Sequence, residues 1–77
     1  MEITLSKKAS KALRALDKTT RARMVAGIYK LPSGDVKKLS GYTAAFRLRI
    51  GDYRVLFEMS ATEIRVSDIL PRGGAYK

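Results

Sequence analysis

The chain contains neither cysteine nor histidine, so any chemistry must come from tyrosine, hydroxyl, carboxylate or cationic side chains. This composition excludes disulfides, thiolate or imidazole metal sites and every histidine-dependent triad. Cations dominate, because 16 Lys and Arg outnumber 7 Asp and Glu and give a formal net charge of +9 on 77 residues. Such a charge predicts a polyanionic partner: nucleic acid, an acidic protein or a membrane surface.

Three arginines lie close together in the sequence, Arg47, Arg49 and Arg54, around the dipeptide Gly51-Asp52. Apolar residues alternate with them at a period of two, which predicts a β-hairpin closed by a two-residue turn with glycine first. In that register Arg49 pairs with Arg54, so the three arginines share one face of the hairpin. The opposite face is apolar and consists of Phe46, Leu48, Ile50, Tyr53, Val55 and Phe57.

The arginine cluster predicts a face that binds phosphate. Like charges directly opposite one another on a sheet cost about 0.2–1 kcal/mol, so the cluster does not stabilise the hairpin. Guanidinium groups grip phosphate bidentately and stay charged at neutral pH, which suits them to hold a phosphodiester in one orientation. The alternative is an ordinary solvated sheet surface, on which arginines point outward and their stems pack on neighbours.

Two antiparallel helices are predicted to precede the hairpin. Ser6 is placed to cap the first helix, whose apolar residues recur at three- and four-residue steps. The second helix is predicted to begin near Thr19 or Thr20 and to end at Leu31-Pro32, because a residue before proline avoids the helical conformation. Residues 37–41 indicate a polar connection into the first hairpin strand.

A third strand is expected to follow the hairpin, from about Glu63 to Leu70. Its alternation changes partway, because the apolar residues before Asp68 indicate one inward face and Ile69 indicates the other. We therefore expect a bulge or a strand end near Asp68. The first few residues of the chain predict an additional edge strand.

Residues 1–77 are expected to form a single domain, because a chain of this length buries only roughly 60% of its unfolded surface and has no room for a second core. No apolar run approaches the roughly 18 residues of a membrane span, and the N-terminus lacks a secretory pattern, so a cytoplasmic location is expected. Neither predicted helix combines its cations with tryptophan or phenylalanine, which argues against membrane binding.

Over nearly its full length the sequence resembles the RelE/ParE superfamily of bacterial toxins from type II toxin–antitoxin pairs. The resemblance rests on the two N-terminal helices, the KKLSG lead-in at residues 37–41, the string FRLRIGDYRVLF at residues 46–57 and the pair Arg72 and Tyr76. It implies an α+β fold in the order β-α-α-β-β-β, similar to microbial ribonucleases. The antiparallel sheet of this fold has the two helices packed on one face.

The RelE branch of the family implies a ribosome-dependent mRNA endoribonuclease, or mRNA interferase, that inhibits translation by 2′-hydroxyl attack and uses no metal or cofactor. By resemblance, Arg47 and Arg49 match positions that hold the RNA backbone, and Arg54 matches an arginine that stabilises the pentacovalent phosphate. Arg72 resembles a phosphate ligand and general acid, and Tyr76 resembles the tyrosine that activates the 2′-hydroxyl. The implied partners are the ribosome, mRNA and a cognate antitoxin with an acidic or amphipathic segment.

Two other functions stay open. A ParE-like poison of DNA gyrase, without ribonuclease activity, would share the fold; the joint presence of the five residues assigned above favours the nuclease. A non-catalytic nucleic-acid-binding module would be expected to show aromatic side chains on the arginine face for base stacking. In the predicted register Tyr53 and Phe57 lie on the other face, which argues against this third function.

Overall fold

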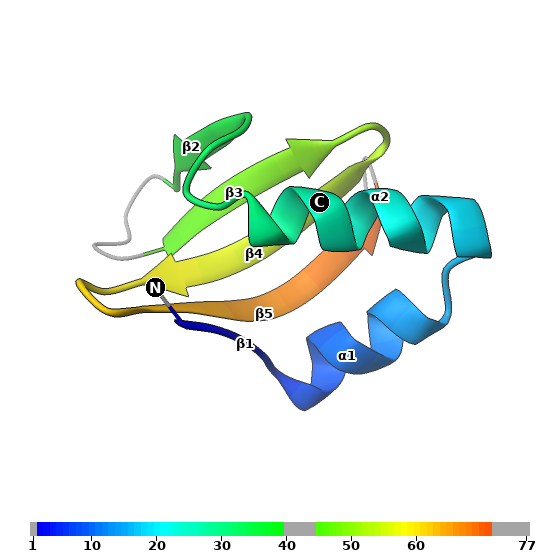
Figure 1. The fold of residues 1–77 in the computed structure, drawn as a ribbon, viewed down its shortest axis with the longest axis horizontal. Helices are drawn as coiled ribbons and strands as arrows, with labels where there is room; N and C mark the ends of the chain where they lie inside the picture. The colour runs from blue at the N-terminus through cyan, green and yellow to red at the C-terminus, as the bar shows by residue number, and fades with distance from the viewer. Residues whose placement is uncertain (1, 40–44, 72–77) are drawn as a thin grey trace.

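The computed structural model describes residues 2–39 and 45–71. It contains two helices and one five-stranded sheet in the strand order β1-β5-β4-β3-β2 (Figure 1). The β1–β5 pair is parallel and the other pairs are antiparallel. The predicted α+β class is confirmed, with one strand more than expected. The elements are β1 (Glu2–Leu5), α1 (Lys7–Arg14), α2 (Lys18–Tyr29), β2 (Val36–Lys38), β3 (Ala45–Ile50), β4 (Tyr53–Met59) and β5 (Glu63–Pro71).

Both helices begin at side-chain caps. Ser6 caps α1 as predicted, because its Oγ accepts a hydrogen bond from the backbone N–H of Ala9 at 3.0 Å. The predicted start of α2 is wrong by one or two residues. Asp17 is the cap, its carboxylate accepting from the backbone N–H of Thr20 at 3.1 Å. Aspartate is a stronger cap than threonine, which explains the earlier start.

β2 is the strand that the sequence did not reveal, since residues 37–41 were expected to be a polar connection. It is three residues long and pairs only with β3, at the edge of the sheet. Short edge strands rich in lysine are common, because they discourage pairing with other chains. Such a strand shows too little alternation to be recognised from sequence.

The β3–β4 hairpin has the predicted register. Arg49 pairs with Arg54 and Ile50 with Tyr53, on either side of Gly51-Asp52. Gly51 has φ +56°, and no described residue other than glycine has a positive φ. A positive φ at the first turn residue alone is typical of a type II′ turn, which matches the twist of the two strands.

The irregularity expected near Asp68 is a β-bulge. Phe57 of β4 pairs with Val66, whereas Leu56 pairs with Asp68, so β5 carries one extra residue, Ser67, between these pairs. The bulge changes the phase of the alternation. Ile69 therefore lies in the core together with Val66, although the two residues are separated by an odd number of positions.

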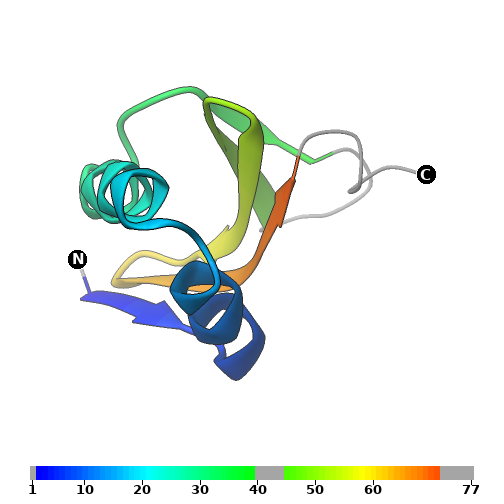
Figure 2. The ribbon, with the colours of Figure 1, turned by 90° about the vertical axis from the view of Figure 1, so that its right-hand side faces the viewer.

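The hydrophobic core lies between the helices and one face of the sheet. In Figure 2, α2 runs along that side of the curved sheet, while α1 lies beside β5, beyond the end of β1. No helix of the described part of the chain covers the other face, which we call the open face. The buried core residues are Ala9, Met24, Ile28, Leu31, Leu48, Val55, Phe57, Ile64, Val66 and Ile69.

Candidate nucleic-acid interface

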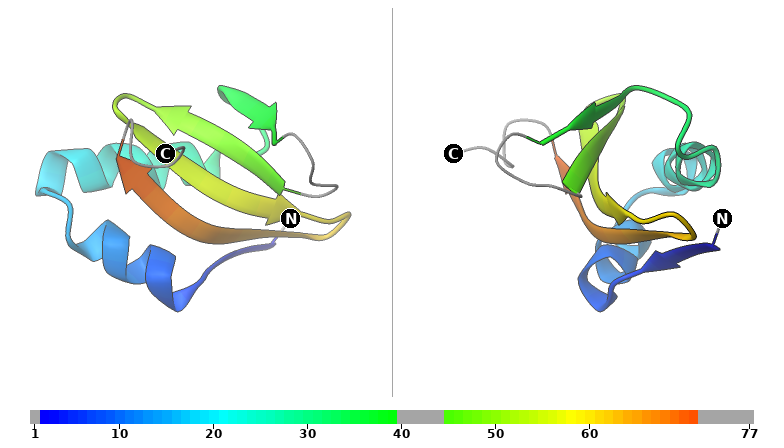
Figure 3. Two further views of the ribbon diagram at one scale, coloured as in Figure 1. Left: turned by 180° about the vertical axis from the view of Figure 1, so that it is seen from behind. Right: turned by 90° about the vertical axis from the view of Figure 1, so that its left-hand side faces the viewer.

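The structure places Arg47, Arg49 and Arg54 together on the open face. Because Arg49 and Arg54 are cross-strand partners and Arg47 lies two residues before Arg49 on β3, the three side chains project from the same side of the hairpin. The left view of Figure 3 shows this side of the sheet, with α2 behind it. The grouping predicted from the sequence is therefore correct.

A fourth cation joins them from β2. Lys37 pairs with Arg47 across the β2–β3 ladder, so it lies on the open face, next to the hairpin arginines. We call Lys37, Arg47, Arg49 and Arg54 the cationic cluster. Sequence analysis missed Lys37 because β2 was not recognised as a strand. The one signal in the sequence was Val36, a single apolar residue directly before the two lysines, which pairs inward with Leu48.

The members of the cluster differ in burial. Lys37 and Arg49 are exposed, whereas Arg47 and Arg54 are half-buried. The Nη1 atom of Arg47 is buried and has no hydrogen-bond partner among the residues that the structure describes. A buried donor left in this state costs about 1–3 kcal/mol. Arg47 therefore carries an unsatisfied donor, which is a cost to the fold at this position.

Apolar and acidic residues border the cluster on the open face. Leu56 lies opposite Arg47, and Leu70 lies opposite Arg54, so an apolar residue is the cross-strand partner of two of the arginines. Glu58 is further from the hairpin turn and pairs with Arg65 of β5. The hairpin end of the open face is therefore strongly positive, while the opposite end carries both signs of charge.

The remaining two predicted site residues, Arg72 and Tyr76, lie outside the described residues. The described chain ends at Pro71, whose partner on β4 is Tyr53, the residue directly before Arg54. Strand β5 therefore reaches the end of the sheet at which the cationic cluster lies.

Neither a metal site nor a membrane span is found in the described part of the chain. Its His, Cys, Asp and Glu side chains form no group of three or more that is able to hold a metal ion. Neither α1 nor α2 has the length and apolar composition that crossing a membrane requires.

Comparisons with known proteins agree on the fold. No protein-family model matches the sequence, and no curated protein matches it. Among solved structures, a chain of the archaeal RelE–RelB complex from Pyrococcus horikoshii OT3 is 29% identical, with a TM-score of 0.80 over 96% of this chain and 97% of that one. A chain of the toxin–antitoxin complex RelBE2 from Mycobacterium tuberculosis is 20% identical, with a TM-score of 0.80 over 92% and 96% of the two chains.

A more distant similarity is to a chain of a ParDE toxin–antitoxin system. A chain of the chromosomal ParDE system from P. aeruginosa is 14% identical, with a TM-score of 0.60 over 94% of this chain and 96% of that one. The similarities thus extend over nearly the whole chain and include RelE, YoeB and ParDE structures. With this fold and these relatives, the chain belongs to the RelE/ParE superfamily of toxins.

Proposed function

We propose that this protein is the toxin of a type II toxin–antitoxin pair and that it cleaves messenger RNA on the ribosome. The observation that carries the proposal is the cationic cluster, in which strand pairing collects three arginines and one lysine on the open face. Similar chains were crystallised as RelE–RelB complexes, which supports an antitoxin as the second partner. An acidic or amphipathic antitoxin segment would complement the formal net charge of +9.

RNA binding is the first task of the cluster. Arg47 and Arg49 are assigned to the RNA backbone, and Lys37 extends the same surface onto β2. Arginine side chains bind phosphate oxygens through two parallel hydrogen bonds, which suits Arg47 and Arg49 to this task. Each phosphate contact releases counterions, so affinity for ribosomes is expected to fall steeply as salt is raised.

Cleavage by the ribose 2′-oxygen needs a base near that hydroxyl, positive charge around the non-bridging oxygens and a proton for the departing 5′-oxygen. We assign Arg54 to the charge that develops on phosphorus, Arg72 to the phosphate and the leaving-group proton, and Tyr76 to the 2′-hydroxyl. Cations around a tyrosine favour its phenolate form, which is the form that accepts a proton. DNA lacks the 2′-hydroxyl and is not cut by this route.

The experiment measures cleavage of a defined message on programmed ribosomes by primer extension. Arg54→Ala is expected to lower the rate about 100- to 1,000-fold, the usual effect of removing one group that stabilises developing charge. Arg72→Ala and Tyr76→Phe should each lower it while antitoxin binding persists. The matched control is Arg65→Ala, because Arg65 is an exposed arginine of β5 whose ion-pair partner, Glu63, lies outside the cluster.

Two results would overturn the proposal. One is purified wild-type protein that leaves the message intact but inhibits DNA gyrase in a supercoiling assay, which would make it a ParE-like poison. The other is Arg54→Ala protein that cuts as fast as the wild type.

A further inference from the structure

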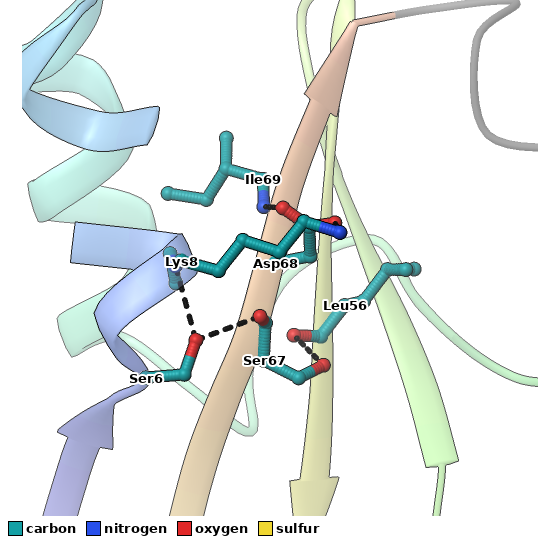
Figure 4. Close-up of polar contacts among 7 residues, drawn as sticks. Ser6, Lys8, Leu56, Ser67, Asp68 and Ile69 are labelled. Carbon is teal, nitrogen blue, oxygen red and sulfur yellow. Dashed lines mark hydrogen bonds and ion pairs between the residues drawn. The ribbon is translucent and has the colours of Figure 1, made fainter. Parts of the chain in front are cut away.

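The bulge of β5 is held by side chains from the start of α1 (Figure 4). The Oγ of Ser6 donates to the carbonyl oxygen of Ser67 at 2.7 Å while it also caps α1. The Oγ of Ser67 donates to the carbonyl oxygen of Leu56, on β4, at 3.1 Å. Two backbone carbonyls at the bulge, those of Ser67 and Leu56, thus accept hydrogen bonds from serine hydroxyls.

Asp68, the next residue, adds a charged contact. Its Oδ1 accepts from the backbone N–H of Ile69 at 2.8 Å, and its Oδ2 lies 3.1 Å from the Nζ of Lys8. In the described part of the chain, Asp68 is the one buried charged residue, with 9% of its surface exposed. The side chain of Lys8 is 76% exposed, and ion pairs with an exposed partner typically contribute only about 0–1 kcal/mol to stability. The pair is therefore better explained by geometry than by stability.

The bulge determines on which face of the sheet each of the last residues of β5 lies. Without the extra residue, Ile69 would share the open face and Leu70 would point into the core, because side chains alternate along a strand. With the bulge, Ile69 pairs with Val55 in the core and Leu70 pairs with Arg54 on the open face. The bulge thus determines which residue of β5 is the cross-strand partner of Arg54. It also determines which face of the sheet Pro71, the last residue of β5, lies on.

We propose that Lys8 and Asp68 are positioning residues for RNA cleavage. Together with Ser6 and Ser67 they form a bulge clamp, which fixes the last three residues of β5 against Arg54. The clamp acts on the cationic cluster through the β4–β5 ladder. This inference rests on the function proposed above, since it assigns the clamp to the placement of the groups that meet the scissile phosphate.

The test uses the full chain with three substitutions in α1 and one in β5. Lys8→Ala and Asp68→Asn break the ion pair, Lys8→Arg keeps it, and Lys7→Ala is the control. Lys7 is the exposed neighbour of Lys8, and both lie in the first turn of α1, where the helix dipole disfavours a cation. Loss of either lysine therefore has the same effect on the helix itself. A difference between the two variants measures the effect of the ion pair between Lys8 and Asp68.

We expect Lys8→Ala and Asp68→Asn to lower kcat for cleavage about 10- to 100-fold, as small displacements of catalytic groups do, with KM changed less than about twofold. Lys8→Arg and Lys7→Ala should keep the wild-type kcat. The double variant Lys8→Ala/Asp68→Asn should be no slower than Asp68→Asn alone, because both changes remove one interaction. A partial loss of folding would also lower the apparent kcat at constant KM, so the folded fraction of every variant is measured by circular dichroism and kcat is calculated per folded molecule.

A second measurement separates this inference from the proposed function. The backbone amide resonances of Arg54 and Leu70 should shift in Lys8→Ala protein and stay in place in Lys7→Ala protein. If the wild type cuts no message but these resonances shift, the proposed function fails and the clamp stands as a structural device. If Lys8→Ala protein keeps both the wild-type kcat and the wild-type resonances, the clamp inference is wrong. The side chain of Lys8 is 76% exposed, so its removal leaves the core intact and the test interpretable.

Discussion

The two faces of the β3–β4 hairpin consist of alternate residues of the same strands, yet they have opposite effects on the stability of the fold. On the helix side, Val55 and Phe57 are completely or almost completely buried, and Phe57 stacks on Phe46 with ring centroids 5.6 Å apart. On the open face, Arg49 stands opposite Arg54. The first arrangement lowers the free energy of the fold, and the second raises it.

The magnitudes make the contrast plain. Burying one large apolar side chain contributes about 1.5–3 kcal/mol, whereas a like-charge pair across a sheet costs about 0.2–1 kcal/mol. The fold tolerates the open face because the core on the other side outweighs its cost. A surface that opposes folding at this scale is informative, since a requirement other than stability accounts for its residues.

The largest expected effect comes from the helix side. Phe57→Ala should lower the free energy of unfolding by about 3–5 kcal/mol, because it leaves a cavity in the core. That loss is comparable to the total stability of a small domain, so most of the protein should unfold. Urea denaturation followed by circular dichroism measures it. If Phe57→Ala protein keeps nearly all of its stability, the division between the two faces is wrong.

Much of this division was readable from the sequence. The period-two alternation and the Gly51-Asp52 turn fixed the hairpin register, and the register alone placed Arg47, Arg49 and Arg54 on one face. Local rules sufficed here because a two-residue turn leaves no freedom in the pairing of its strands.

Two parts of the site depended on contacts between distant segments and were not predicted. Lys37 joins the cluster only because β2 pairs with β3, and three residues carry too weak a pattern to reveal that pairing. The irregularity near Asp68 was predicted, but its partners were not. Lys8 lies near the other end of the sequence, and only the parallel β1–β5 pairing brings the start of α1 to the bulge.

A smaller effect of opposite sign is expected on the open face. Arg49→Thr removes one member of the cross-strand arginine pair and introduces a residue that favours strands, so the free energy of unfolding should rise by about 0.2–1 kcal/mol. The same variant should bind ribosomes more weakly, with a shallower dependence on salt, because one phosphate contact is lost. Denaturation and binding assays at several salt concentrations measure both quantities. A variant that loses stability would show that Arg49 serves the fold, and the contrast between the faces would disappear.

The smallest effect belongs to the start of α2, which lies on neither face and therefore supplies a reference. Hydrogen bonds from Thr20, first from its side chain and then from its backbone N–H, lower the pKa of the exposed Asp17 carboxyl below its ordinary value of 3.8. A carboxyl whose pKa is lower in the folded state adds stability above its unfolded pKa and loses it as pH falls through the folded value.

An asparagine at this position would cap α2 without titrating, so Asp17→Asn protein isolates this contribution. The stability difference between wild type and Asp17→Asn should stay constant from about pH 7 to pH 5 and then change in favour of the variant below about pH 4. Urea denaturation of both proteins across this range measures the difference. A difference that is the same at every pH would mean that the cap carries no charge-dependent stability. Because the substitution keeps the cap and changes no residue of the cationic cluster, message cleavage at neutral pH should be equal in the two proteins, which keeps this reference independent of either face.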